Sequence, residues 1–246
     1  CNSYIIAYSG GMDSTVLLHY ANSVSNSRIL AASVVSEFTS KKDKQLMLRN
    51  KNSKSKFKLI KLSILKNNKV VKNPLDRCYF CKKDIFKQII VLAKEENYEC
   101  VFDGSNKDDE FDIRPGKKAL REFKVRSPFL EAGFTKEDIK KLAKKLNLDV
   151  YKIPSNSCLA TRIPFNSAIT IDKLKRIEKC EDYLSSLNIS KIRVRDHNEL
   201  ARIEVNKIDI NKIIKNKDNI VTFFKKQNYS YVTIDLEGYI MGKFMN

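Results

Sequence analysis

The chain has 246 residues, a length that suits one large domain or two modest ones. Hydrophobic residues make up 42% of it, yet no stretch approaches the run of about 20 apolar residues that a membrane helix needs, so we expect no membrane helix and no membrane partner. The net charge of +18 suits nucleic acid, a membrane surface or small anions, but lysines are scattered throughout, so charge alone favours a polyanionic partner only weakly.

Strand-like and helix-like segments alternate through the first part of the chain. The β-rich runs are 3–8, 29–35, 57–62 and 100–103, and the helical patterns are 14–24, 41–52, 79–96 and 136–146. This alternation predicts an α/β fold in which helices cover both faces of a parallel sheet. The carboxyl ends of the strands would then share one edge, where ligands bind.

The pattern changes near Tyr151. A loop-like segment at 154–167 is followed by an amphipathic helix at 170–187, a hairpin at 191–195 and 200–205, two short helices and a last strand at 231–236. We therefore expect a first domain over 1–150 and a smaller α+β domain over 151–246. No signal peptide is visible, so we expect a cytoplasmic protein; because the chain starts at Cys1 rather than Met, we also expect a leading helix ahead of it.

The run Tyr-Ser-Gly-Gly-Met-Asp-Ser at 8–14 follows a strand and opens a helix. Glycines let the backbone turn tightly and present its N–H groups to an anion, and the helix N-terminus adds partial positive charge. Ser9 and Ser14 can donate to phosphate oxygens, whereas Asp13 suits a divalent cation that bridges phosphates. The loop resembles that of the PP-loop ATP pyrophosphatases, and this resemblance implies transfer of AMP to the substrate, with ATP held by residues 9–11, 13 and 14.

The six cysteines lie in a chain expected to be intracellular, where disulfides are rare, so a clustered set indicates a metal or catalytic role. Cys78 and Cys81 share one face of a helix, but they also extend an apolar stripe, so metal and core are supported about equally. Cys158 in a loop favours a three-thiolate set. An iron–sulfur cluster with one open iron and a zinc ion completed by His197 compete for that set. We expect Cys100 and Cys180 to be structural.

Several further motifs occur in order: Phe-Asp-Gly-Ser-Asn-Lys-Asp-Asp at 102–109, Asp-Ile-Arg-Pro-Gly at 112–116, the segment 158–165, and two strand segments at 193–198 and 201–204. Together they resemble the LarE family of sulfur insertases, over almost the whole chain. The resemblance implies that ATP adenylates the carboxylates of pyridinium-3,5-biscarboxylic acid mononucleotide. A sulfur nucleophile then displaces AMP to give thiocarboxylates, in the synthesis of a nickel-pincer nucleotide.

The resemblance also implies roles for single residues. Arg193 and Arg195 alternate along a strand and match positions that hold the substrate phosphate, although a basic exposed face would give the same pattern. Asp13 and Cys158 would be catalytic. Asp109 would assist catalysis or position Mg²⁺, and a solvated acidic loop at 108–112 is the alternative.

This chain departs from the sacrificial members of the family, which give up the sulfur of one cysteine, because Ser157 stands at that position and Cys78 replaces a tryptophan. It resembles the branch in which Cys78, Cys81 and Cys158 bind a [4Fe-4S] cluster that delivers sulfide from an external donor. Glu181 and Glu204 match two acids of a family cation site, but Lys212 replaces a third, so we expect no metal there.

Three other functions remain open from the sequence. They are a cluster-dependent tRNA thiolase, a sacrificial cysteine sulfur transferase without a cluster, and a non-catalytic metal or nucleotide carrier. The charge of +18 would suit RNA, but no additional Cys-x-x-Cys module or dedicated RNA-binding motif is present, so we expect no nucleic-acid partner. The family resemblance implies a homo-oligomer, such as a hexamer.

Overall fold

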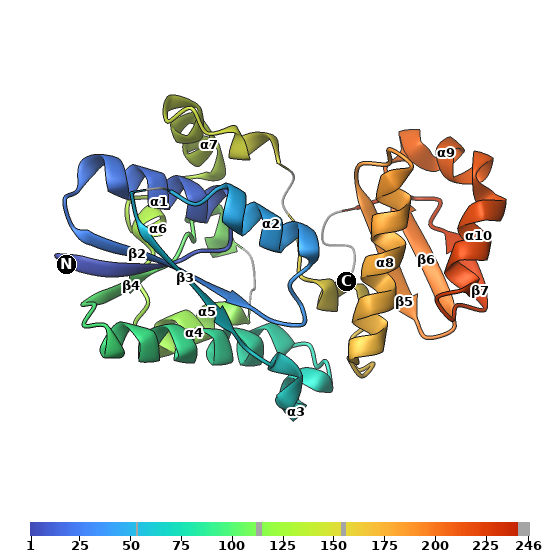
Figure 1. The fold of residues 1–246 in the computed structure, drawn as a ribbon, viewed down its shortest axis with the longest axis horizontal. Helices are drawn as coiled ribbons and strands as arrows, with labels where there is room; N and C mark the ends of the chain where they lie inside the picture. The colour runs from blue at the N-terminus through green and yellow to red at the C-terminus, as the bar shows by residue number, and fades with distance from the viewer. Residues whose placement is uncertain (53, 112–114, 154–155, 241–246) are drawn as a thin grey trace. The chain divides into compact units, whose positions relative to one another are not determined.

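The computed structural model describes residues 1–52, 54–111, 115–153 and 156–240, and they form two compact units (Figure 1). The first unit contains Cys1–Ile64 and Asp76–Ser157, and the second contains Leu65–Leu75 and Cys158–Asn246. The division therefore falls at residue 157 rather than at the expected 150, and it includes a short segment from far earlier in the chain.

Backbone hydrogen bonds explain why the early segment belongs to the second unit. The N–H of Asn166 donates to the Asn73 carbonyl at 2.8 Å, and the N–H of Ile169 donates to Val71 at 2.9 Å. The Asn73 side chain is fully buried and donates to the Pro164 carbonyl at 2.7 Å. The segment is thus bound to the loop that precedes the long helix of the second unit.

The first unit is built on a four-stranded parallel sheet, which confirms the predicted α/β class. Its strands are β1 (Ser3–Ala7), β2 (Arg28–Val35), β3 (Lys56–Lys61) and β4 (Cys100–Phe102), in the order β3-β2-β1-β4. The expected helices are present as α1 (Met12–Val24), α2 (Lys41–Arg49), α4 (Arg77–Glu95) and α7 (Lys136–Lys145). The shorter helices α5 (Gly116–Glu122) and α6 (Pro128–Glu131) are not apparent from the sequence pattern.

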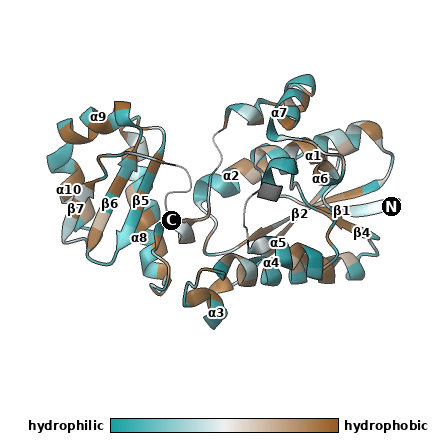
Figure 2. Cartoon of the chain, turned by 180° about the vertical axis from the view of Figure 1, so that it is seen from behind, coloured by the Kyte–Doolittle hydropathy of each residue, from teal (hydrophilic) through white to brown (hydrophobic). Residues whose placement is uncertain are grey.

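Helices cover both faces of this sheet (Figure 1). Tyr4 and Ile6 of β1 pack with α1 and α7, whereas Ile5 packs with α4 and α5. Successive residues of a strand point to opposite faces, so one apolar run supplies both cores. In Figure 2, helices such as α4 alternate between hydrophobic and hydrophilic residues, as expected for helices with one buried side.

The second unit has a three-stranded sheet in the order β5-β6-β7. The strands β5 (Ile192–His197) and β6 (Leu200–Val205) form the predicted hairpin, and β7 (Tyr231–Ile234) pairs with β6 in parallel. The helices are α3 (Asn68–Val71), α8 (Ile171–Ser186), α9 (Ile210–Lys215) and α10 (Lys217–Lys225). Cys180 and Leu184 of α8 are fully buried against apolar side chains of this hairpin and of α10, which confirms the structural role expected for Cys180.

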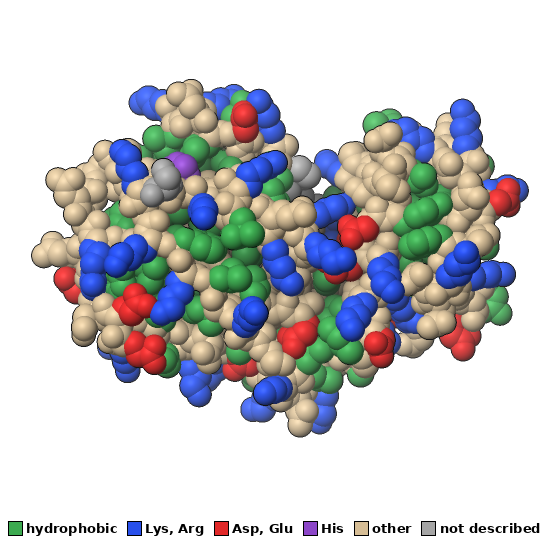
Figure 3. Space-filling model, in the orientation of Figure 1, with side chains coloured by type: hydrophobic (Ala, Val, Ile, Leu, Met, Phe, Trp, Pro, Cys, Tyr) green, Lys and Arg blue, Asp and Glu red, His purple; other side chains and the backbone are tan. Residues whose placement is uncertain are grey.

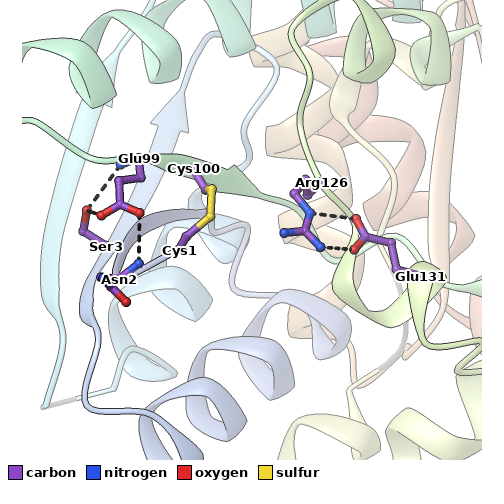
Figure 4. The surroundings of a disulfide bond; sticks show 7 residues. All are labelled: Cys1, Asn2, Ser3, Glu99, Cys100, Arg126 and Glu131. Atoms are coloured by element: carbon purple, nitrogen blue, oxygen red, sulfur yellow. Dashed lines mark hydrogen bonds and ion pairs between the residues drawn. A yellow bond between two sulfur atoms is a disulfide. The ribbon is translucent and has the colours of Figure 1, made fainter.

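A disulfide joins Cys1 to Cys100, with their Cα atoms 6.4 Å apart (Figure 4). The expectation of no disulfide is therefore wrong in this structure. The reason is the strand order: β4 is the parallel neighbour of β1, with Tyr4 opposite Cys100, so the amino ends of the two strands lie together. Beside the disulfide, the N–H of Asn2 donates to Glu99 at 3.0 Å, which holds the first residues against the sheet.

Within the described residues, no helix is both long enough and apolar enough to cross a membrane.

Candidate functional site

The glycine-rich loop lies between the carboxyl end of β1 and the start of α1. Gly10 has a φ of +75°, and a Cβ placed on it would lie 2.6 Å from the backbone nitrogen of Met47 in α2. Only glycine fits such a position, because a side chain would meet both backbone strain and rigid neighbouring atoms. The Asn50 amide donates to the Gly10 carbonyl at 3.2 Å and so fixes the turn from the other side.

The loop presents N–H groups and hydroxyls to one small region. Gly11 is the N-cap of α1 and has no side chain to cap the first turn. The hydroxyl oxygens of Ser9 and Ser14 are 3.0 Å apart, and the Gly11 N–H donates to Ser9 Oγ at 3.3 Å. A helix N-terminus with this set of donors is suited to bind phosphate.

The loop lies at the point where the strand order of the sheet reverses. β1 has β2 on one side and β4 on the other, so the chain leaves β1 toward β2 and later enters β4 on the opposite side of β1. The segment after β4 returns to the start of α1, because a Cβ on Gly104 would lie only 2.9 Å from the backbone nitrogen of Ser14. Parallel α/β proteins bind ligands at this kind of position.

Two of the predicted acidic residues lie near this edge. The Asn106 amide donates to Asp13 Oδ2 at 3.4 Å, and Asp109 accepts the backbone N–H of Asn106 at 3.0 Å. Asp109 is only 8% exposed, so the alternative of a solvated acidic loop is wrong for this residue. The predicted motif residues 112–114 lie outside the described residues.

The Cys-x-x-Cys pair lies on the first turn of α4. Cys78 is exposed and Cys81 is partly exposed, whereas Ile89 and Leu92 further along the same helix are buried. The interpretation of both cysteines as core residues is therefore wrong for Cys78. The Arg77 guanidinium, itself buried, donates to Cys78 Sγ at 3.8 Å.

Cys158 belongs to the second unit, whereas Cys78 and Cys81 belong to the first. It is partly exposed and precedes a short 3₁₀ helix, Leu159–Arg162, and its carbonyl accepts the Thr161 N–H at 3.0 Å. Among the described residues, no group of three or more His, Cys, Asp or Glu side chains is arranged to hold a metal ion. Of the three residues, Cys78 is thus the most exposed.

The predicted arginines differ in their surroundings. Arg195 is 5% exposed and forms a two-point pair with Glu204, with nitrogen–oxygen distances of 2.9 and 2.8 Å, and it donates to the Thr161 carbonyl. Arg193 is partly buried, with its guanidinium 5.2 Å from the centre of the Tyr239 ring. Burial, followed by the charge of Arg162, lowers the pKa of Arg193, so an anion near this residue would relieve an unfavourable environment.

Buried ion pairs in the second unit are the feature that the sequence did not reveal. Arg162 is 1% exposed and contacts both oxygens of Glu181 at 2.9 and 3.1 Å, and Arg202 also contacts Glu204 at 3.2 Å. The carboxylates expected to resemble a cation site, Glu181 and Glu204, are therefore bound to arginines. Alternation of charged and apolar residues at 192–195 and 202–205 is the signal that a polar sheet face is present there.

The remaining candidate ligand, His197, ends β5. Burial and the neighbouring Arg202 lower its pKa below the ordinary 6.5, which favours the neutral imidazole. Its Nε2 is buried and accepts or donates no hydrogen bond within the described part of the chain. A neutral imidazole could serve as a zinc ligand, which keeps the zinc alternative chemically reasonable.

The chain is similar to three known proteins over almost its whole length. No family model matches it. The chain is 39% identical over 238 residues to an uncharacterized protein of Methanocaldococcus jannaschii, which covers 96% of this chain and 90% of the relative. It is 33% identical over 246 residues to an uncharacterized protein of Synechocystis, which covers 97% and 90%. It is 31% identical over 240 residues to the pyridinium-3,5-bisthiocarboxylic acid mononucleotide synthase of Lactiplantibacillus plantarum, which covers 97% and 87%.

Proposed function

Because the chain belongs to the family of pyridinium-3,5-bisthiocarboxylic acid mononucleotide synthases, we propose that it is an ATP-dependent sulfur transferase acting on a pyridinium carboxylate mononucleotide. Its substrate would be the 3,5-biscarboxylic acid, and its products would be the thiocarboxylate, AMP and pyrophosphate. The glycine-rich loop at the strand-order reversal is the observation that carries this proposal.

The proposed first step is adenylation. A ring carboxylate oxygen attacks the α-phosphorus of ATP, and pyrophosphate leaves. Ser9, Gly10, Gly11 and Ser14 would hold the departing phosphates, and Asp13 would hold the Mg²⁺ that neutralises them. This activation is needed because a carboxylate resists nucleophilic attack, whereas its mixed anhydride with AMP has a good leaving group.

The proposed second step transfers sulfur. A sulfur nucleophile adds to the activated acyl carbon, and AMP leaves with the electron pair of the carbon–oxygen bond. We propose that Cys78, Cys81 and Cys158 together bind a [4Fe-4S] cluster, since Cys78 and Cys81 lie three residues apart at the start of α4 and all three residues are at least partly exposed. When bound, such a cluster would supply an open iron that carries external sulfide.

The substrate phosphate is proposed to contact Arg193. This guanidinium is partly buried and donates to the Ile192 carbonyl at 2.7 Å. Arg195 would contribute positive charge while its pair with Glu204 holds the strand face in place. Because Arg193 carries five N–H donors in a planar group, it can bind a phosphate at two points.

The test is turnover by anaerobically purified protein with ATP, the biscarboxylic acid mononucleotide and sulfide. AMP and thiocarboxylate are measured by mass spectrometry, and several product molecules per chain are expected. Cys158→Ala should abolish the visible cluster absorbance and the thiocarboxylate while AMP formation persists. Cys180→Ala is the matched control, because Cys180 lies in the core of the second unit.

The same experiment separates the alternatives. A colourless protein containing zinc would overturn the cluster, and a chain that loses one sulfur at a cysteine would support the sacrificial mechanism. Absence of AMP formation would overturn the adenylation step itself.

A tRNA thiolase is the rival enzyme. On the face shown in Figure 3, Lys and Arg side chains are spread widely, with Asp and Glu side chains among them. Filter binding with total tRNA tests this rival, since strong and salt-sensitive binding would favour it. We further propose that the enzyme is cytoplasmic and works as a homo-oligomer. Sedimentation of the purified protein would test the oligomeric state.

A further inference from the structure

Asn106 lies fully buried beside the glycine-rich loop, in the segment that follows β4. Its Nδ2 donates to Asp13 Oδ2 at 3.4 Å. Burying an amide group is costly unless it is hydrogen-bonded, so this contact helps to satisfy the buried Asn106 side chain. It joins the acid proposed to hold Mg²⁺ to a second segment of the same sheet edge.

The orientation of the Asn106 amide is fixed by its other contacts. Its Oδ1 accepts the backbone N–H of Asp108 at 3.1 Å, which an amide nitrogen could not do. The NH₂ end must therefore point toward Asp13. The Asn106 backbone N–H donates to Asp109 Oδ2 at 3.0 Å, and the Asp109 N–H donates back to the Asn106 carbonyl at 3.1 Å.

The segment that carries Asn106 packs on α1 at Gly104 and is hydrogen-bonded to residues near α6 on its other side. Gly104 packs against the backbone of Ser14 so closely that a Cβ would lie at 2.9 Å. The Asp103 carboxylate accepts hydrogen bonds from Ser105 at 2.6 Å and from Ser127. The Lys107 N–H donates to the Phe134 carbonyl at 2.8 Å. These contacts restrain the segment that carries Asn106 beside the start of α1.

We propose that Asn106 is a positioning residue that sets the orientation of the Asp13 carboxylate toward the Mg²⁺ of bound MgATP, and that Asp109 acts through Asn106 rather than on the substrate. This inference rests on the proposed function. It reassigns Asp109, for which a catalytic or metal-binding role was predicted, because one of its carboxylate oxygens caps the Asn106 turn. A misdirected Asp13 would bind the metal more weakly without altering the loop amides that bind phosphate.

The first test measures binding without turnover. The dissociation constant of Mn²⁺ is measured by electron paramagnetic resonance in the presence of α,β-methylene-ATP, an analogue that cannot be cleaved at the α-phosphorus. Asn106→Ala is expected to weaken Mn²⁺ binding about 10-fold or more, the range for losing a hydrogen bond to a charged group. Binding of the analogue without metal should change less than about 3-fold. Asp108→Ala is the matched control, because Asp108 bonds to Asn106 through its backbone N–H, while its side chain accepts the Lys136 N–H.

The second test compares two substitutions of Asp109. Asp109→Asn keeps an oxygen that can accept the Asn106 N–H, so Mn²⁺ affinity should stay within about 3-fold of wild type. Asp109→Ala removes that acceptor and should match Asn106→Ala. Equal losses in Asp109→Asn and Asp109→Ala would overturn the proposal, because a metal ligand or a proton-transfer group needs the carboxylate itself.

The outcomes also distinguish this inference from the proposed function. Wild-type protein that binds no Mn²⁺ with the analogue would overturn both. Wild-type binding that is unaffected in folded Asn106→Ala, with folding checked by circular dichroism, would overturn the positioning role alone.

Discussion

The contact between Gly10 and α2 predicts a large effect of a single methyl group. In Gly10→Ala the new Cβ would lie 2.6 Å from the Met47 nitrogen and 2.8 Å from its Cα, at a φ of +75°. The left-handed conformation costs a non-glycine residue about 1–2 kcal/mol. Overpacking against backbone atoms adds about 1–3 kcal/mol, because α2 cannot move away as the tip of a side chain could. The expected loss of unfolding free energy is therefore about 2–5 kcal/mol.

Gly133 provides a matched control for this prediction. Its φ is +73°, nearly the same as that of Gly10, but nothing lies within 4 Å of the position where a Cβ would stand. Gly133→Ala should therefore show only the conformational cost of about 1–2 kcal/mol. The effect of alanine on the entropy of the unfolded chain is shared by both variants and cancels in the comparison.

The assay is urea unfolding followed by far-ultraviolet circular dichroism, since the chain has no tryptophan to report fluorescence. Binding of α,β-methylene-ATP is measured in parallel. Gly10→Ala should unfold at lower urea than Gly133→Ala and should lose nucleotide affinity, whereas Gly133→Ala should keep it. Equal unfolding midpoints and equal nucleotide affinity for the two variants would refute the reasoning.

Three other predictions concern buried groups. Glu204→Gln should cost about 3–5 kcal/mol of unfolding free energy, because it leaves the buried charge of Arg195 uncompensated. Glu131→Gln, at an exposed ion pair, should cost under about 1 kcal/mol. Equal urea midpoints for the two variants would contradict this prediction. Burial raises the pKa of Cys180 to about 12, so iodoacetamide near pH 8 should label Cys78 but not Cys180 in native protein, as peptide mass mapping would show. Burial lowers the pKa of His19 below its ordinary 6.5, so protonation favours the unfolded chain, and stability should fall as the pH drops through about 6.5. His19→Gln should reduce this fall, measured as the urea midpoint at several pH values. An unchanged dependence of the midpoint on pH would disprove the prediction.

Much of the fold could be predicted because local patterns agree with it. The β1 run and the alternation with amphipathic helices give the parallel sheet, and the short turn after His197, with Asn198 at a φ of 62°, gives the hairpin. The glycine-rich loop is recognisable because its residue types are tied to a single backbone geometry.

Other features depend on contacts between residues far apart in sequence, which no local pattern contains. The pairing of Cys1 with Cys100 needs the knowledge that β4 lies beside β1. The contact of Asn106 with Asp13 joins residues 93 positions apart. An asparagine in a polar loop is typical of a turn, so its burial could not be inferred from the sequence. The pairs formed by Arg162 and Arg195 were hidden for the same reason, since an isolated arginine usually indicates an exposed position.

Because Leu65–Leu75 belong to the second unit, that unit cannot finish folding until the end of the chain has been synthesised. During translation these residues leave the ribosome long before the loop at 163–169, with which they exchange hydrogen bonds. Residues 65–75 must therefore remain without these hydrogen bonds until the second unit has been synthesised. If the chain were divided after residue 157, the first fragment would carry residues 65–75 without their partners. The second fragment would lack the backbone groups that bond to its loop at 163–169.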